Sequence, residues 1–216
     1  MAVTVYTYGK LQQSLLEGRI NFATDTIKVM LLSAYTVGTT LDTAQFLSAV
    51  LAAGTEASGS GYTAGGATLA SKTVTYTAAG SWSTQRANST AYTVGDVVRP
   101  ASTNGYVYQA VVGGTSGGSA PTWPTVIGTT VTDGGVTWVC QGTGVLVVDA
   151  ADPSWTTSSG GTLAASHAVF YKDTGTTSTS PVIALWDLGG TATATNGGAF
   201  TMTLDSGEGL LTLFTN

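Results

Sequence analysis

The side chains that could act as acids, bases or nucleophiles are few and widely spaced in this sequence. The single histidine, His167, lies in a segment whose apolar residues alternate as in a strand. A lone imidazole in such a place is more often a surface or hydrogen-bonded residue than a base. Because no further acids converge on it in the sequence, we expect a protein that is not an enzyme.

Two pairs of carboxylates raise the question of glycoside hydrolysis or calcium binding. Asp149 and Asp152, followed by Pro153, fit a turn in which short carboxylates bond their own backbone. Asp205 and Glu208 lie among glycines in the same way. Both chemistries require further carboxylates at the same site. The sequence therefore predicts no metal and no cofactor.

The single cysteine, Cys140, restricts the chemistry further. One thiol excludes an internal disulfide, and with one histidine it excludes a Cys/His zinc site. Cys140 follows Trp138 in a segment typical of a strand, where a thiol behaves as a small buried hydrophobic group. We expect it to be inert.

Aromatic side chains are the most suggestive group, and they gather between residues 81 and 142. That segment is too short for an ordinary core, so we expect the rings themselves to build it.

These rings lie in a segment that interrupts a strand. Residues 61–79 contain a glycine turn followed by Thr, Leu, Val and Tyr residues that fit a half-buried strand. The next segment that could pair with it is 144–149. The simplest interpretation is a discontinuous host domain, 1–80 and 143–216, with a small all-β module, 81–142, inserted into a hairpin turn.

The rest of the host domain predicts a mainly β fold, either a β-sandwich or a jelly-roll-like arrangement with one or two short helices. Residues 3–20 are the best helix candidate, with Gly18 as its stop, although residues 1–9 could instead form an arm; residues 41–52 are a second helix candidate. The predicted strands are 25–32, 145–148, 165–171, 181–188, 199–204 and 210–214.

Composition excludes several classes of function. Only 9% of residues are charged, against about a quarter in ordinary domains. The net charge is −5 and the seven Lys and Arg residues are scattered, so we expect no nucleic-acid binding. No apolar segment is long enough to span a membrane, and the N-terminus does not resemble a secretory signal, so we expect synthesis in a cytoplasm.

The host segments resemble a family of structural proteins from tailed bacteriophages. The resemblance rests on 8–32, on the Ser-Gly-Tyr-Thr-Ala-Gly-Gly-Ala-Thr-Leu sequence of 60–69, and on 168–171, 181–187 and 200–204. It covers most of 1–80 and 143–216. In that family the strand after the Tyr-Thr-Ala-Gly-Gly loop continues directly into the segment that matches Val145, which agrees with an insertion.

The inserted segment is similar to small chitin-binding-type carbohydrate modules. The resemblance is carried by Tyr-Thr-Val-Gly-Asp-Val-Val at 92–98, Tyr-Val-Tyr-Gln-Ala at 106–110 and Pro-Thr-Trp at 121–123. Such modules bind sugars on exposed rings, which implies this role for Trp82, Tyr92, Tyr108 and Trp123. In a module this small the alternative is that the same rings form the core, and the sequence leaves both interpretations open.

Together the resemblances imply a virion structural protein, and a capsid decoration protein is the first expectation. Its partners would be the major capsid protein or other virion proteins, further copies of itself in a homo-oligomer (a trimer is favoured), and a polysaccharide. It would lie on the outer surface of the virion after synthesis in the host cytoplasm. A tail or baseplate component with a glycan-recognising module, and a polysaccharide-degrading enzyme, are the alternatives.

Overall fold

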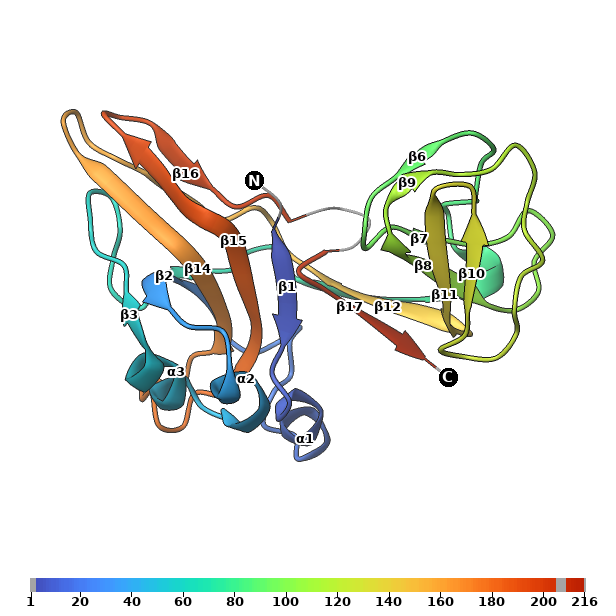
Figure 1. Cartoon of the computed structure of the whole chain (residues 1–216). Helices are drawn as coiled ribbons and strands as arrows, with labels where there is room; N and C mark the ends of the chain where they lie inside the picture. Colours follow the sequence, from blue (N-terminus) through green and yellow to red (C-terminus); the bar gives the residue numbers. More distant parts are fainter. Residues whose placement is uncertain (1–2, 205–208, 216) are drawn as a thin grey trace. The chain divides into compact units, whose positions relative to one another are not determined.

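The computed structural model describes residues 3–204 and 209–215 and confirms the mainly β class (Figure 1). The chain divides into two compact units. The first comprises Met1–Thr73 and Val148–Leu211, and the second comprises Val74–Val147 and Thr212–Asn216. The alternation of strand and turn in the sequence thus belongs to two separately packed units.

The first unit is built on one antiparallel sheet in the order β1-β15-β14-β2-β3, with β4 also paired to β2. Its strands are β1 (Thr4–Thr7), β2 (Ile27–Tyr35), β3 (Gly54–Glu56), β4 (Ala67–Thr68), β14 (Thr162–Lys172) and β15 (Val182–Thr195). A separate ribbon pairs β13 (Ser154–Thr156) with β16 (Ala199–Thr201). Its helices are α1 (Leu11–Leu16), α2 (Thr39–Thr43) and α3 (Leu47–Ala53).

The central strands of this sheet are buried on both faces because both sets of alternating residues are apolar. On one face, Leu32 of β2, Val169 of β14 and Leu185 of β15 pack with Leu47 and Val50 of α3. On the opposite face, the rings of Phe170 and Trp186 lie 5.4 Å apart, and the Trp186 indole N–H donates to the Leu210 carbonyl at 3.2 Å. A sandwich or jelly-roll arrangement stays a prediction.

Both helix predictions need correction. In residues 3–20 only Leu11–Leu16 are helical, and Gly18, with a φ of +67°, follows the helix end as the predicted stop. Residues 4–7 form β1, which folds back to pair with β15, so they are neither helix nor an arm. The second predicted helix is broken into α2 and α3, since Phe46 bridges to Pro181 and the Leu47 N–H donates to the Ser180 carbonyl. In both places pairing with β15 or its start outweighs local helix propensity.

The second unit contains a four-stranded sheet in the order β10-β11-β8-β7, a β6-β9 ribbon and a three-stranded sheet in the order β17-β12-β5. The elements are β5 (Thr73–Ala78), η1 (Ala79–Ser81), β6 (Ala91–Tyr92), β7 (Val97–Val98), β8 (Val107–Val112), β9 (Gly114–Thr115), β10 (Thr130–Asp133), β11 (Val136–Gly142), β12 (Gly144–Asp149) and β17 (Leu211–Thr215). The interrupted strand β5 therefore does lie beside its resumed partner β12.

The unit boundaries differ from those predicted at 80/81 and 142/143. The second unit takes in most of β5, β12 and β17 because Val145, Val147 and Phe214 pack against Trp82. The connecting hairpin is thus packed with the inserted segment. The change in residue composition near residues 81 and 142 indicates an inserted segment, but it does not show that the flanking strands pack with that segment.

Candidate functional site

Three of the four predicted glycan-binding rings form the core of the second unit. Trp82 is buried, and its indole N–H donates to the Val97 carbonyl at 2.9 Å. Tyr92 is buried edge-on against Trp138, with ring centroids 4.9 Å apart. Tyr108 has no exposed surface, and its hydroxyl donates to the Pro124 carbonyl at 2.7 Å.

These positions correct the expectation that all four rings present faces to a sugar. A ring with no exposed face cannot stack on a ligand, and burial raises the pKa of the Tyr108 hydroxyl to about 12. The physical reason is the size of the module: with short strands and few large aliphatic side chains, the aromatic rings must fill its interior.

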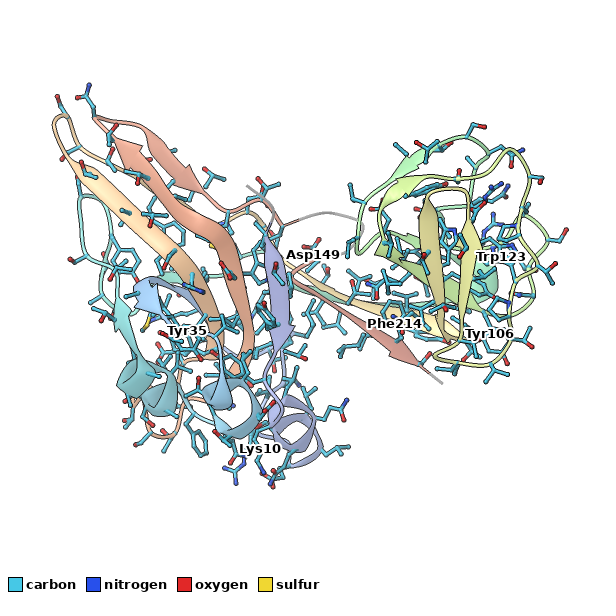
Figure 2. The ribbon with its side chains drawn as sticks, viewed as in Figure 1. Lys10, Tyr35, Tyr106, Trp123, Asp149 and Phe214 are labelled. Carbon is cyan, nitrogen blue, oxygen red and sulfur yellow. The ribbon has the colours of Figure 1, made fainter. Side chains whose placement is uncertain are left out.

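Trp123 differs from the other three, since it is only half-buried. Its ring lies 4.3 Å from Tyr108 and 6.1 Å from Trp138, between centroids, and so covers the edge of the core. Tyr106, which is not among the four rings predicted to bind a glycan, is half-buried and packs against the same core (Figure 2). Its position two residues before Tyr108, on the same side of the chain as that ring, could have indicated this.

We name Tyr106 and Trp123, together with Asn104, the aromatic surface. The Asn104 amide links Tyr106 to the buried Tyr108, because Nδ2 donates to the Tyr108 hydroxyl at 2.6 Å and Oδ1 accepts from the Tyr106 backbone N–H at 3.2 Å. Half-exposed rings beside an ordered amide suit apolar ring contact with polar groups at the edge. This is the candidate binding site in the second unit.

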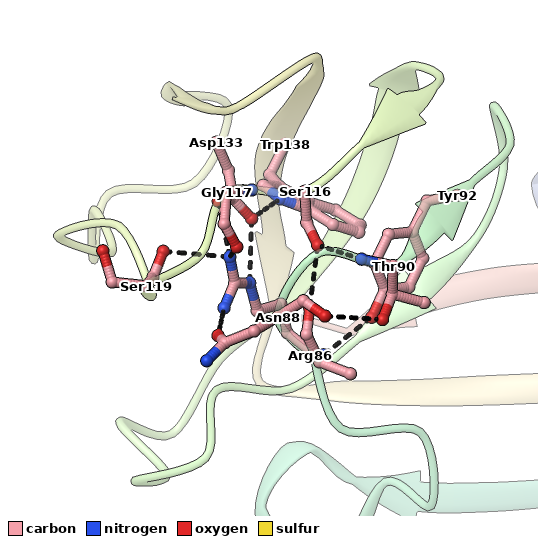
Figure 3. Close-up of polar contacts among 10 residues, drawn as sticks. Arg86, Asn88, Thr90, Tyr92, Ser116, Gly117, Ser119, Asp133 and Trp138 are labelled. Carbon is pink, nitrogen blue, oxygen red and sulfur yellow. Dashed lines mark hydrogen bonds and ion pairs between the residues drawn. The ribbon is translucent and has the colours of Figure 1, made fainter.

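A buried ion pair holds the loops of this unit (Figure 3). The Arg86 guanidinium donates from Nε and Nη2 to the two carboxylate oxygens of Asp133, at 2.9 and 2.7 Å. The two side chains are only 2% and 1% exposed. Arg86 also bonds the carbonyls of Gly117 and Ser119, and Asp133 accepts from the Trp138 indole and the Gly117 N–H.

Burial by itself would raise the pKa of Asp133, but the hydrogen bonds from Arg86, Trp138 and Gly117, with the Arg86 charge, lower the pKa overall. The charged form of the Asp133 carboxyl is therefore favoured, and both of its oxygens are hydrogen-bonded. Such a network fixes a single arrangement of the Gly117–Ser119 loop and is a structural feature, not a reactive one.

Ser116 beside this network lies in a Gly-Thr-Ser-Gly-Gly sequence that fits the spacing of a nucleophile elbow. Its side chain is buried, and its hydroxyl donates to the Ala87 carbonyl and accepts from the Thr90 N–H. A nucleophile elbow is a turn from a strand into a helix, which exposes the serine. The residues after Ser116 run as a loop to β10 (Thr130–Asp133) and not as a helix, so this arrangement does not support acyl transfer.

In the first unit, His167 lies between a serine and a carboxylate. Its Nδ1 is 2.9 Å from the Ser166 hydroxyl and its Nε2 is 3.8 Å from Asp187 Oδ1. Burial lowers the pKa of His167, although the Asp187 charge opposes this. The Ser166 hydroxyl also contacts the Ser33 carbonyl, a backbone acceptor for its proton, so the serine is not set up as a nucleophile.

The predicted acid pairs and Cys140 behave as turn and core residues where they are described. Asp149 Oδ1 accepts from the next N–H, and Asp152 Oδ1 accepts from the Leu204 N–H. Asp205 and Glu208 lie outside the described residues. Cys140 is buried, and burial raises the pKa of its thiol. Within 3–204 and 209–215 no three His, Cys, Asp or Glu side chains converge as metal ligands.

The first unit also has a cavity of about 300 Å³. Its lining includes Trp186, Leu188, Phe200 and Met202, and it contains no titratable side chain among the described residues. This cavity could accept an apolar group but offers no acid–base chemistry.

Comparison with known proteins adds no identification: no family model, no curated protein and no solved structure matches this chain. Among the described residues, no helix is both long and apolar enough to cross a membrane.

Proposed function

We propose that this chain is a structural protein of a tailed-bacteriophage virion, and specifically a decoration protein that binds the outer surface of the capsid. The observation that carries the proposal is where the phage-like segments lie. Residues 27–32, 168–171 and 182–187 of these segments lie in β2, β14 and β15, the central strands of the first unit, so a large part of the resemblance falls on one folded sheet.

The loop within residues 60–69, which is part of the resemblance, is also held to this sheet. Glu56 Oε1 accepts from the Tyr62 hydroxyl at 2.9 Å and from the Gly65 N–H at 2.6 Å. The Tyr171 hydroxyl of β14 donates to the Gly65 carbonyl at 2.7 Å. The Tyr62 and Gly65 residues of the Tyr-Thr-Ala-Gly-Gly sequence therefore hold this loop to the sheet. Such a structural role supports a shared fold with the phage proteins that contain the same sequence.

The mechanism of decoration is binding linkage. A protein that binds only the assembled lattice of the major capsid protein stabilises that lattice by mass action. A homo-oligomer, with a trimer as the favoured order, would attach through several weak contacts at once, so affinity arises from multivalency without a deep polar pocket. Low charge suits broad contacts of this kind, and no catalytic step is involved.

The test uses particles stripped of their minor proteins. Light scattering gives the mass of the purified chain, and sedimentation then measures its binding to heads and to tails separately. Co-sedimentation with heads, and density for many copies over the head in imaged particles, is the expected result. Binding to tails without binding to heads would overturn the decoration proposal.

The aromatic surface favours a second candidate, a tail or baseplate component that recognises a glycan on the bacterial surface. The rings of Tyr106 and Trp123 are half-exposed and can contact a sugar, whereas the other candidate rings are buried. In either location the same surface would bind polysaccharide weakly, and many copies would strengthen the attachment. The two candidates differ in location, which the sedimentation experiment separates.

Glycan binding is tested by variants of this surface. We expect Tyr106→Ala to weaken binding to chitin or to bacterial capsular polysaccharide about fivefold, because one ring contact contributes about 1 kcal/mol. Val94→Ala, which alters a side chain that is 68% exposed in the same unit, is the matched control and should leave binding unchanged. If Tyr106→Ala and Val94→Ala bind the polysaccharide equally well, the aromatic surface is not the binding site.

A further inference from the structure

Strand β5 is an exposed edge of the three-stranded sheet. That sheet has the order β17-β12-β5, so β5 has β12 on one side and no partner strand on the other among the described residues. Every residue from Thr73 to Ala78 is exposed or half-exposed. Val74 is 45% exposed and Tyr76 is 56% exposed. This is an apolar strand with one side available for pairing.

The strand lacks the usual protection of a sheet edge. Natural edge strands are commonly blocked by charged side chains or proline, which prevent association with another strand. The sequence Thr-Val-Thr-Tyr-Thr-Ala contains neither, and all its residues except Ala78 favour strands. An edge of this composition is suited to accept a further strand by backbone hydrogen bonding.

We propose that the occupant is β5 of a second copy of this chain, paired antiparallel about a two-fold axis at Thr75. The backbone supports this register. The Ala79 N–H donates to the Thr143 carbonyl at the start of β12, so by alternation the backbone groups of Thr77 and Thr75 point toward β12. Those of Val74 and Tyr76 point away, toward the edge where the second copy would bind.

In this register Val74 of one copy lies opposite Tyr76 of the other and forms a hydrogen-bonded pair with it. The same pair occurs twice, once on each side of the axis, as a two-fold interface requires. At the axis Thr75 lies opposite its own copy in a non-hydrogen-bonded pair, the type with the closer side chains. The directions of the backbone groups therefore match without any shift.

The side chains are self-complementary in the same register. Val74 and Tyr76 lie on one face, where the Tyr76 ring covers Gly144 of β12. The register therefore places two Val74–Tyr76 pairs on the same face of the ribbon, and aromatic and β-branched residues favour one another across strands. Thr73 lies opposite Thr77. Lys72 lies opposite Ala78 of the other copy, which keeps the two ammonium groups at opposite ends of the ribbon. The pairs formed by residues 73–77 are all uncharged, so no like charges face each other across the interface.

This two-fold contact does not depend on the virion role, and it is measured on the isolated chain. It also differs from the contact that a trimer needs, because a three-fold arrangement cannot use the same patch of both neighbours. A dimer, or a hexamer that pairs two trimers through β5, is consistent with the proposal. A strictly trimeric or monomeric chain is not.

Cysteine cross-linking tests the register directly. Cys140 is buried, so Thr75→Cys supplies one accessible thiol per chain. With copper phenanthroline as oxidant, we expect this variant to form a disulfide-linked species of twice the 21.7 kDa chain mass, since opposite Cβ atoms in such a pair lie about 4.5–5.5 Å apart, close to disulfide geometry. Thr73→Cys alone should remain unlinked, because residue 73 lies opposite residue 77.

A mixture of Thr73→Cys and Thr77→Cys chains should cross-link, which distinguishes a defined register from random collision. Thr75→Lys, which places two like charges at the axis, should weaken the association seen by light scattering at least tenfold. Thr4→Lys on the exposed edge of β1 is the control for added charge. Circular dichroism of each variant verifies folding.

Three outcomes would overturn the proposal. The first is equal cross-linking of the 73, 75 and 77 variants, and the second is no cross-linking of a folded Thr75→Cys chain at millimolar concentration. The third is cross-linking of Thr75→Cys to a different virion protein in assembled particles while the isolated chain stays monomeric. That last result would assign the β5 edge to a heterologous partner.

Discussion

At the scale of single residues, Arg86 and Asp133 decide how the second unit is held together. A buried pair of charges is costly to desolvate, and only complete hydrogen bonding offsets that cost. Here the carboxylate accepts from Arg86, from the Trp138 indole and from the Gly117 N–H, while the guanidinium also bonds two loop carbonyls. The pair fixes a glycine-rich loop that has little apolar surface of its own.

We therefore expect Asp133→Asn to destabilise the second unit by about 3–5 kcal/mol, because it leaves the Arg86 charge buried without its partner. Hydrogen exchange of peptides from β8 and β11 measures the change. Glu17→Gln, which alters an exposed pair with Arg19, is the control and should leave this exchange unchanged. Protection that survives Asp133→Asn would show that the pair contributes nothing to the unit.

Acid provides a second readout of the same interaction. The folded-state pKa of Asp133 is lowered, so its stabilising contribution is present above the ordinary carboxyl pKa and is lost as the pH falls through the folded-state pKa. The stability difference between the wild-type chain and Asp133→Asn should accordingly shrink as the pH falls below about 4. A difference that is constant from pH 7 to pH 2 would contradict this assignment.

At the scale of elements, the loop between β3 and β4 shows how closely two segments approach. A Cβ on Gly66, which has a φ of +75°, would lie 1.9 Å from the Val29 carbonyl oxygen of β2. Only glycine combines that backbone angle with that approach. The second glycine of the Tyr-Thr-Ala-Gly-Gly sequence is thus required by packing against the sheet.

Gly66→Ala should destabilise the first unit strongly. Gly175 has a similar φ of +81° but open space around its Cβ position, so Gly175→Ala is the matched control for backbone strain alone, which is about 1–2 kcal/mol. We expect Gly66→Ala to cost at least about 2 kcal/mol more than the control because the clash must be relieved by moving β2. Equal urea midpoints for Gly66→Ala and Gly175→Ala would contradict the interpretation that the close approach to β2 requires glycine at position 66.

Elements also show where local sequence signals fail. Residues 41–52 have helical spacing, yet residues 44–46 are not helical, and the Val182 N–H at the start of β15 donates to the Gln45 carbonyl. Residues 4–7 likewise join β15. In both cases the partner lies more than a hundred residues away in the sequence. No local pattern contains that information.

At the scale of the whole molecule, the insertion accounts for the division into two units. The Ala79 N–H donates to the Thr143 carbonyl at 2.9 Å, so the two ends of the inserted segment leave adjacent strands. The core cluster of the first unit around Leu47 and Leu185 contains no residue from 81–142. The first unit therefore has the means to fold without the inserted segment.

We expect a chain in which Asn-Gly replaces residues 81–142 to keep the first unit folded. The free energy of opening measured by hydrogen exchange in β14 and β15 should change by less than about 1 kcal/mol, because the deleted residues share no partners with that core. Leu185→Ala in the same shortened chain is the control, and it should lower the free energy of opening of these strands by about 2–5 kcal/mol because it removes buried side-chain atoms from the core. Loss of protection throughout β14 and β15 on deletion would mean that the units do not fold independently.

The sequence by itself determined the mainly β class, the helix stop at Gly18 and the pairing of β5 with β12 across the insertion. It also predicted a buried strand at 25–32, which the structure shows at Ile27–Tyr35. Each of these depends on local pattern: alternation, turn glycines or a change in composition. Such patterns report which face of a segment is apolar, and that is sufficient to recognise a strand.

Only the tertiary structure decided which aromatic rings are buried. Trp82, Tyr92 and Tyr108 have the same residue types and similar spacing whether they face a sugar or a core, so the sequence left both interpretations open. The structure buries these three and leaves Trp123 and Tyr106 half-exposed. The physical reason is that exposure depends on how strands far apart in the chain pack around each ring, and that packing is a property of the whole unit.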